Sequence, residues 1–168
     1  MKQESEIDIR NSVNTFPLQL NVNGENLKAK IDFIDSLYDT LRDHFNLTGT
    51  KAACLEGECG SCSVIINGEV VTSCLVMAAQ CHKKKVTTIE GLVNDRIGST
   101  LQNSFVQCGA IQCGYCTPGL IITARQLLKK NPTPSRENII NALEGNLCRC
   151  TGYTKIIDAV FHASQELS

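Results

Sequence analysis

The chain has 168 residues, a formal net charge of −1 and 42% hydrophobic residues, which suits one globular domain or two small ones. The near-neutral charge gives no support for nucleic-acid binding, and no apolar run is long enough to span a bilayer. The ten cysteines are the unusual feature of the composition.

The N-terminus bears on the compartment in which these cysteines work. Residues 1–14 form a polar N-terminal extension without the apolar stretch of a signal peptide. In a secreted protein, ten cysteines would indicate disulfides, whereas a reducing cytoplasm keeps thiols free for metal. We therefore expect a cytoplasmic, metal-binding protein.

The first elements predicted along the chain are a β-hairpin and a helix. Apolar residues alternate with polar ones on both sides of Asn23-Gly24: Leu18, Leu20, Val22, Leu27, Ala29 and Ile31. This pattern predicts two paired strands joined by a tight turn. The segment from Ser36 to Asp39 resembles a capping box, so a helix is expected to begin there, with Leu37, Tyr38, Leu41 and Phe45 on one face.

A cysteine-rich loop follows this helix. The first cysteine set, as we call it, has the C-x4-C-x2-C…C spacing of a plant-type [2Fe–2S] site and consists of Cys54, Cys59, Cys62 and Cys74. Gly57 and Gly60 allow the backbone to bend sharply around a cluster. A zinc site is the alternative, but zinc ligands are usually spaced differently.

A second hairpin and one more strand complete the first half. Valines and isoleucines flank Asn67-Gly68 between residues 64 and 71, and residues 86–89, which are all β-branched, are expected to form a further strand. Two hairpins, a helix and a metal-binding loop indicate an α+β domain, which we place at residues 15–89.

Beyond residue 89 the pattern changes to four short helices, which predict a four-helix bundle domain over residues 90–168. Ser99 is the expected cap of the first helix, and Thr117 is the expected cap of the second, with Pro118 at its first helical position. Ser135 is the expected cap of the third. The apolar stripe of the last helix contains Ile156, Ile157, Val160 and Ala163.

The second cysteine set, defined as Cys113, Cys116, Cys148 and Cys150, is a weaker signal on spacing alone. A single C-x2-C pair can also bind zinc or form a redox dithiol. The helix expected after Cys116 would place the positive end of its dipole near an anionic cluster. Cys108 repeats the first spacing together with Cys113 and Cys116, so the residues themselves leave open whether Cys108 is a ligand.

The sequence contains no recognisable catalytic machinery. It has no Gly-x-Gly-x-x-Gly turn and no P-loop, and its three histidines, His44, His82 and His162, are scattered. Two clusters alone can transfer electrons, so the substrate chemistry is expected on partner proteins. A free-standing ferredoxin and a zinc-stabilised binding module are the alternatives.

Three segments, residues 56–62, 112–119 and 146–153, closely resemble the small iron–sulfur subunit of molybdenum hydroxylases. These enzymes include xanthine dehydrogenases, aldehyde oxidoreductases and aerobic carbon monoxide dehydrogenases. The resemblance extends from about residue 15 to about residue 163 and covers the three motifs in order. Ala53 stands where the family commonly has glycine, and Tyr115 stands where phenylalanine is frequent.

The resemblance implies more than the spacing does. It implies a β-grasp ferredoxin fold for the first domain, ligation of the second cluster by the 113/116 and 148/150 pairs, and a place near the pterin for Gln112 and Cys150. It also implies a large molybdenum–pterin subunit and a medium FAD subunit as partners, assembled as a dimer of heterotrimers. Electrons would pass from the former through two [2Fe–2S] clusters to the latter. Hydroxylation of a purine or another N-heterocycle is the favoured overall reaction, with an aldehyde or carbon monoxide dehydrogenase as the alternative.

Overall fold

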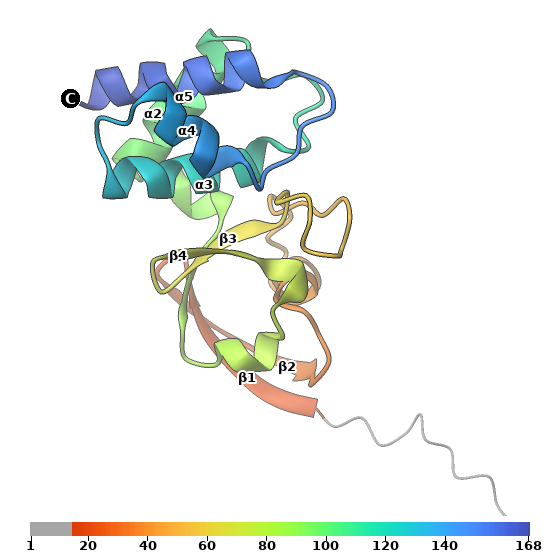
Figure 1. Cartoon of the computed structure of the whole chain (residues 1–168). Helices are drawn as coiled ribbons and strands as arrows, with labels where there is room; N and C mark the ends of the chain where they lie inside the picture. Colours follow the sequence, from red (N-terminus) through yellow and green to blue (C-terminus); the bar gives the residue numbers. More distant parts are fainter. Residues whose placement is uncertain (1–14) are drawn as a thin grey trace, which may run out of the picture.

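The computed structural model describes residues 15–168, so the predicted polar extension at 1–14 lies outside the described residues (Figure 1). A mixed five-stranded sheet comes first along the chain, and helices follow it, as an α+β fold requires. The strands are β1 (Thr15–Val22), β2 (Glu25–Asp32), β3 (Ser63–Ile66), β4 (Glu69–Thr72) and β5 (Lys85–Thr87). The α-helices are α1 (Leu37–Asp39), α2 (Arg96–Gln107), α3 (Thr117–Lys130), α4 (Arg136–Leu143) and α5 (Tyr153–Leu167). None of the helices in the described part of the chain has the length and apolar character needed to cross a bilayer.

Both predicted hairpins are confirmed. The strand order is β2-β1-β5-β3-β4, with β1 antiparallel to β2 and β3 antiparallel to β4. Asn23 and Gly24 have φ of 54° and 93°, and Asn67 and Gly68 have φ of 49° and 95°. Two positive φ values in succession define a turn that matches strand twist, and Asn-Gly adopts it at low cost. β5 joins the hairpins because it pairs parallel to β1 and antiparallel to β3.

Two of the shorter elements differ from the prediction. Ser36 caps α1 as expected, accepting a 3.0 Å hydrogen bond from the Asp39 backbone N–H, but the helix continues as a π-helix over Thr40–His44. The strand predicted at 86–89 ends at Thr87. The Thr88 N–H donates to the Asn23 side chain at 2.9 Å instead of to a neighbouring strand, and a 3-10 helix occupies Ile89–Leu92.

The helix starts are partly as predicted. Ser135 caps α4 through a capping box with Asn138, which confirms the predicted cap. Ser99 is not the cap of α2, because the helix begins earlier, after Asp95, whose carboxylate accepts from the Gly98 N–H at 2.8 Å. Asp95 is favoured over Ser99 as the cap because a carboxylate at a helix N-terminus also interacts favourably with the helix dipole.

The chain buries two hydrophobic clusters, one under the sheet and one among the helices. Leu18, Leu20 and Val64 belong to the first cluster. The second contains residues of α2 to α5 and also Ile65 of β3. Ile65 enters the helical cluster because successive strand residues point to opposite faces of the sheet. The helices therefore pack on the sheet, with α3 next to β3 (Figure 1).

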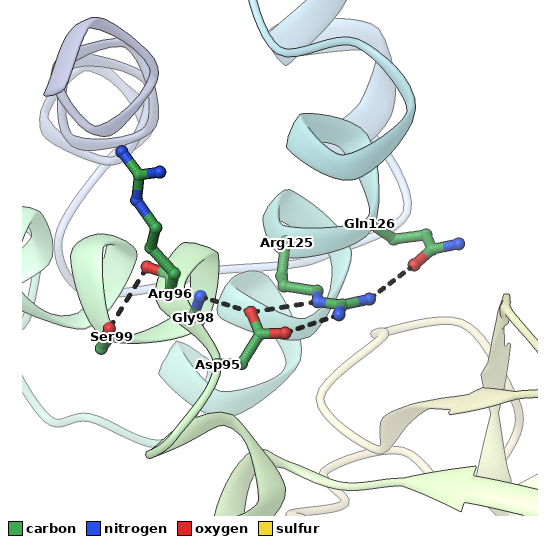
Figure 2. A network of polar contacts seen from close by, with 6 residues as sticks. All are labelled: Asp95, Arg96, Gly98, Ser99, Arg125 and Gln126. Carbon is green, nitrogen blue, oxygen red and sulfur yellow. Dashed lines mark hydrogen bonds and ion pairs between the residues drawn. The ribbon is translucent and has the colours of Figure 1, made fainter. Parts of the chain in front are cut away.

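Polar contacts reinforce this junction, as Figure 2 shows. Arg125 of α3 donates to the Asp95 carboxylate, with Nη2 2.6 Å from Oδ2. The neighbouring Gln126 is 6% exposed, and its side-chain amide donates to the Gly68 carbonyl in the β3–β4 turn. α3 is thus bonded both to the start of α2 and to the sheet.

Candidate metal centres

The structure brings the first cysteine set together from two parts of the chain. Cys54, Cys59 and Cys62 lie in the loop between the π-helix and β3, and Cys74 lies in a 3-10 helix, Ser73–Leu75, after β4. The Cys54 Sγ is 3.3 Å from the Cys59 Sγ. The Cys74 thiol lies beside that of Cys62 and is also close enough to Cys54 for their charges to interact. All ten cysteines of the chain are free thiols.

The loop bends where the sequence predicted. Gly57 and Gly60 have φ of 79° and 66°, a region that suits glycine, and Leu55 also has a positive φ of 59°. A Cβ on Gly57 would collide with the Leu75 side chain. The bend therefore depends on the two glycines, which bring the segment from Cys54 to Cys62 close to the Cys74 turn.

The surroundings shift the pKa values of Cys59 and Cys74 in opposite directions. Burial raises the pKa of Cys59, but hydrogen bonds to the backbone of Ser61 and Ala53 outweigh it and lower the pKa to about 6. Burial raises the pKa of Cys74 to about 11, and the adjacent Cys62 thiol adds to the effect. A hydrogen-bonded thiolate is the form that ligates metal, so Cys59 is prepared for this role by its own loop.

The second cysteine set comes from two loops of the helical half. Cys113 and Cys116 precede α3, and Cys148 and Cys150 lie between α4 and α5. The Cys150 Sγ is 3.6 Å from the Cys113 Sγ, and the Cys116 thiol lies beside that of Cys148. Cys113 and Cys150 are exposed, whereas Cys116 and Cys148 are half-buried.

Helix and backbone donors act on this set as well. Burial raises the pKa of Cys116 to about 12, with a further contribution from Cys148. Burial also raises the pKa of Cys148, but N–H groups of Thr151 and Cys150 lower it more. Thr117, predicted as the cap of α3, is its first helical residue, and Cys116 itself occupies the cap position, with Pro118 in the first turn. The sulfur of Cys116 thus belongs to the residue at the positive end of the helix dipole.

The two remaining cysteines have other surroundings. Cys108 is the C-cap residue of α2 and packs against the helical hydrophobic cluster. Cys81 is fully buried in the cluster under the sheet, and burial raises its pKa. Both act as small apolar side chains in these positions.

The donor sets suit [2Fe–2S] clusters. Each set consists of two pairs of thiols, and a [2Fe–2S] cluster takes four cysteine ligands, two on each iron. Over residues 15–168, no three His, Cys, Asp or Glu side chains are arranged to hold one metal ion. Both cysteine sets present their thiols as two adjacent pairs.

The sequence did not predict that the two centres would touch. The Cys59 carbonyl accepts a 2.9 Å hydrogen bond from the Leu147 N–H. The Asn146 side-chain amide donates to the Gly60 carbonyl, also at 2.9 Å, and Asn146 is 4% exposed. The Tyr115 hydroxyl donates to the Ala52 carbonyl at 2.8 Å. The available signal was a polar residue, Asn146, two positions before Cys148, but its hydrogen-bond partner is 86 residues away.

Comparison with known proteins agrees with this geometry. Residues 3–101 match the family described as "2Fe-2S iron-sulfur cluster binding domain", and residues 88–161 match "[2Fe-2S] binding domain". The chain is 49% identical to the nicotinate dehydrogenase small FeS subunit of Eubacterium barkeri, over 90% of this chain and 96% of that one. The chain belongs to the family of small iron–sulfur subunits of molybdenum hydroxylases.

Other members of this iron–sulfur subunit family are similar along nearly their whole length. The nicotine 6-hydroxylase small subunit of Paenarthrobacter nicotinovorans is 42% identical, over 89% of this chain and 90% of that one. The crystal structure of quinoline 2-oxidoreductase from Pseudomonas putida 86 contains a chain with a TM-score of 0.85 and 39% identity, covering 91% of this chain and 96% of that chain. The predicted family, the [2Fe–2S] cofactors and the role as a subunit of an oxidoreductase are confirmed.

Gln112 and Cys150, which the family resemblance places near the pterin, lie at one exposed edge of this iron–sulfur subunit. Gln112 is exposed and directly precedes Cys113, whose sulfur is paired with that of Cys150. The structure thus puts both residues on the surface where a partner subunit can reach them.

Proposed function

We propose that this electron-transfer subunit holds one [2Fe–2S] cluster in each cysteine set and relays electrons from a molybdenum–pterin subunit to an FAD subunit. The observation that carries the proposal is the arrangement of two paired sets of thiols in loops that touch each other. A free ferredoxin needs only one such set, and a second set on its own helices suits a fixed relay.

The chain's own residues prepare both sites. When bound, [2Fe–2S] clusters supply reversible one-electron transfer, at potentials set partly by hydrogen bonds to their sulfurs. Backbone N–H groups of Ser61 and Thr151 face the thiols of Cys59 and Cys148. Such donors favour a negative sulfur and raise the potential of the site they face.

The proposal includes the division into domains. Residues 15–89 would form a β-grasp ferredoxin domain and residues 90–168 a four-helix bundle. The mixed sheet, the two hydrophobic clusters and the four longer helices support this division. The two family matches overlap over residues 88–101, on both sides of the proposed boundary.

The exposed edge at Gln112 and Cys150 is proposed to face the pterin of the large subunit. An amide there can donate and accept hydrogen bonds with the polar edge of a pterin. The first cysteine set would then serve the FAD subunit, and the complete enzyme would be a cytoplasmic dimer of heterotrimers.

The proposed overall reaction is hydroxylation of an N-heterocycle such as nicotinate or a purine. It is supported by relatives whose names carry nicotinate, nicotine and quinoline. The substrate pocket would lie on the large subunit, because the described residues of this chain show no catalytic group.

The test is purification of the chain from its native source through an affinity tag, followed by a substrate screen. We expect molybdenum–pterin and FAD subunits to copurify, and nicotinate or a purine to bleach the visible cluster absorption. If only aldehydes or carbon monoxide bleached the absorption, the proposed substrate class would be wrong, but the proposed electron relay would still hold. A chain that purifies alone and is reduced by none of these compounds would indicate a free ferredoxin.

A further inference from the structure

The two loops that carry the cysteine sets are joined through their backbones. The Cys59 carbonyl accepts from the Leu147 N–H at 2.9 Å, and Leu147 is followed directly by Cys148. One hydrogen bond therefore connects the backbone of a cysteine in the first set to the residue before a cysteine in the second. Electron tunnelling weakens less through bonds and hydrogen bonds than through gaps, so this contact is a direct route between the sets.

Asn146, the residue directly before Leu147, supports this contact. Its backbone N–H donates to the Leu143 carbonyl at 2.9 Å, which fixes it to the end of α4. Its side-chain amide donates to the Gly60 carbonyl at 2.9 Å in a buried environment. The same carbonyl accepts from the N–H and the hydroxyl of Ser63, at 3.1 and 2.7 Å. Asn146 thus holds the Gly60–Ser61 peptide, which comes directly after the peptide whose carbonyl, that of Cys59, Leu147 binds.

The two loops approach too closely for an added side-chain carbon. A Cβ on Gly60 would collide with the Gly145 carbonyl oxygen and the Asn146 amide. A Cβ on Gly119, in the first turn of α3, would collide with the Gly60 carbonyl oxygen. The contact is therefore backbone against backbone, with one buried amide closing it.

We propose that Asn146 is a positioning residue for electron transfer between the two cysteine sets, because it keeps the hydrogen bond between the Cys59 carbonyl and the Leu147 N–H closed. The inference rests on the proposed assignment of one cluster to each set. With one cluster held by each set, the step would be the transfer of a single electron that oxidises one cluster and reduces the other. No bond forms or breaks, and no proton is required.

The chain offers a matched control for a purely structural role. Gln126 is also a buried side-chain amide that donates to a glycine carbonyl across the junction of sheet and helices, in this case Gly68. Gly68 lies in the turn at the far end of β3 from the Cys59–Gly60 loop. Both variants therefore remove a hydrogen bond from a buried amide to a glycine carbonyl. Asn146→Ala removes it between the two cysteine loops, and Gln126→Ala removes it away from them.

The experiment compares these variants in the full chain with both clusters in place. Iron content is measured first, because a parent chain without clusters would contradict the proposed function and not this inference. Three measurements follow. They are amide exchange at Leu147, the magnetic coupling between the two reduced clusters in electron paramagnetic resonance, and the rate of inter-cluster electron transfer after flash photoreduction. Amide exchange is also recorded on the chain without clusters, where it reports the contact alone.

With Asn146→Ala, we expect about tenfold faster exchange at Leu147, since about one hydrogen bond's worth of local stability is lost. Inter-cluster transfer should slow and the magnetic coupling should change, at full iron content. Gln126→Ala should lower the melting temperature and leave all three unchanged. Equal slowing in both variants, or unchanged transfer in Asn146→Ala, would overturn the inference. If Asn146→Ala does not fold, Asn146→Ser, whose hydroxyl is too short to replace the amide, carries the same expectations.

Discussion

The surroundings of each cysteine sulfur decide which cysteines are suited to bind a cluster. Cys148 and Cys150 lie beside Cys116 and Cys113, whereas Cys108 is the C-cap residue of α2 and belongs to neither of these thiol pairs. The spacing alone allowed Cys108 as a ligand, because Gly109 permits a turn there. Sequence spacing could not decide the matter, since the second half of the set arrives from the loop after α4.

Replacing Cys148 and Cys108 separately tests this assignment. Cys148→Ser should lose or strongly perturb one cluster, because serine provides no thiolate. Cys108→Ser should keep two clusters per chain with an unchanged electron paramagnetic resonance spectrum, and serves as the matched control. Iron content and the spectrum are measured for each. A silent Cys148→Ser with cluster loss in Cys108→Ser would reverse the assignment.

Replacing Gln112 tests whether the exposed edge at Gln112 and Cys150 faces the pterin. Gln112→Ala should keep both clusters, because its side chain is exposed and is not a ligand. Substrate-driven reduction of the clusters in the complete enzyme should slow by about tenfold, the effect of losing about one hydrogen bond to the pterin. Gln107→Ala, at an exposed glutamine that ends α2, is the control. Stopped-flow reduction equal to the parent would remove Gln112 from the pterin site.

At the scale of elements, the first turn of α3 must approach the first cysteine loop closely. Alanine at an ordinary helix position is more stable than glycine by up to about 1 kcal/mol. At Gly119 the expected sign is reversed, because the added Cβ would collide with the Gly60 carbonyl.

Gly119→Ala should therefore lower the free energy of unfolding by about 1–3 kcal/mol, the usual cost of overpacking. Gly145→Ala is the control, since open space surrounds its Cβ position. Denaturant unfolding of both variants measures the difference. Greater stability in Gly119→Ala than in the parent would show that the two loops are not in this tight contact.

The start of α2 provides a pH-dependent prediction. Burial raises the pKa of Asp95, but hydrogen bonds from Arg125 and the Gly98 N–H outweigh it and hold the pKa below the ordinary value of 3.8. A carboxyl group whose pKa is lower in the folded state stabilises the fold above its unfolded-state pKa. That contribution disappears as the pH falls through the folded-state value.

Asp95→Asn should thus lower the free energy of unfolding at pH 7 by about 1–3 kcal/mol, and the difference from the parent should shrink below about pH 4. Glu69→Gln is the control, because the ion pair of Glu69 with Lys130 is largely exposed and contributes about 1 kcal/mol or less. Chemical unfolding at a series of pH values measures both. A difference independent of pH would contradict the role of the Asp95 charge.

The elements also show where sequence reasoning succeeds. Both hairpins were predictable because Asn23-Gly24 and Asn67-Gly68 are local signals that need no distant partner. The start of α2 was not predictable, since Asp95 and Ser99 are both good caps. The helix dipole favours the Asp95 carboxylate, and the distant Arg125 adds an ion pair that the sequence does not reveal. The π-helix after α1 has no comparable sequence signal.

At the scale of the whole molecule, the sheet and the helices are joined along α3 and at the cysteine loops. Each cysteine set could be recognised from spacing and family resemblance, because cluster ligation constrains residues within a motif. The contact between the sets could not be predicted from the sequence, since Asn146 and Gly60 meet only after both halves have folded and packed. The relay therefore depends on tertiary structure more than either motif does.

The most direct test of the account is the count of iron and acid-labile sulfide in the purified chain, with zinc measured on the same sample. Two [2Fe–2S] clusters require about four irons and four sulfides per chain, with visible absorption that bleaches on reduction. We expect that result, with zinc well below one atom per chain. A colourless chain with stoichiometric zinc and no sulfide would contradict it.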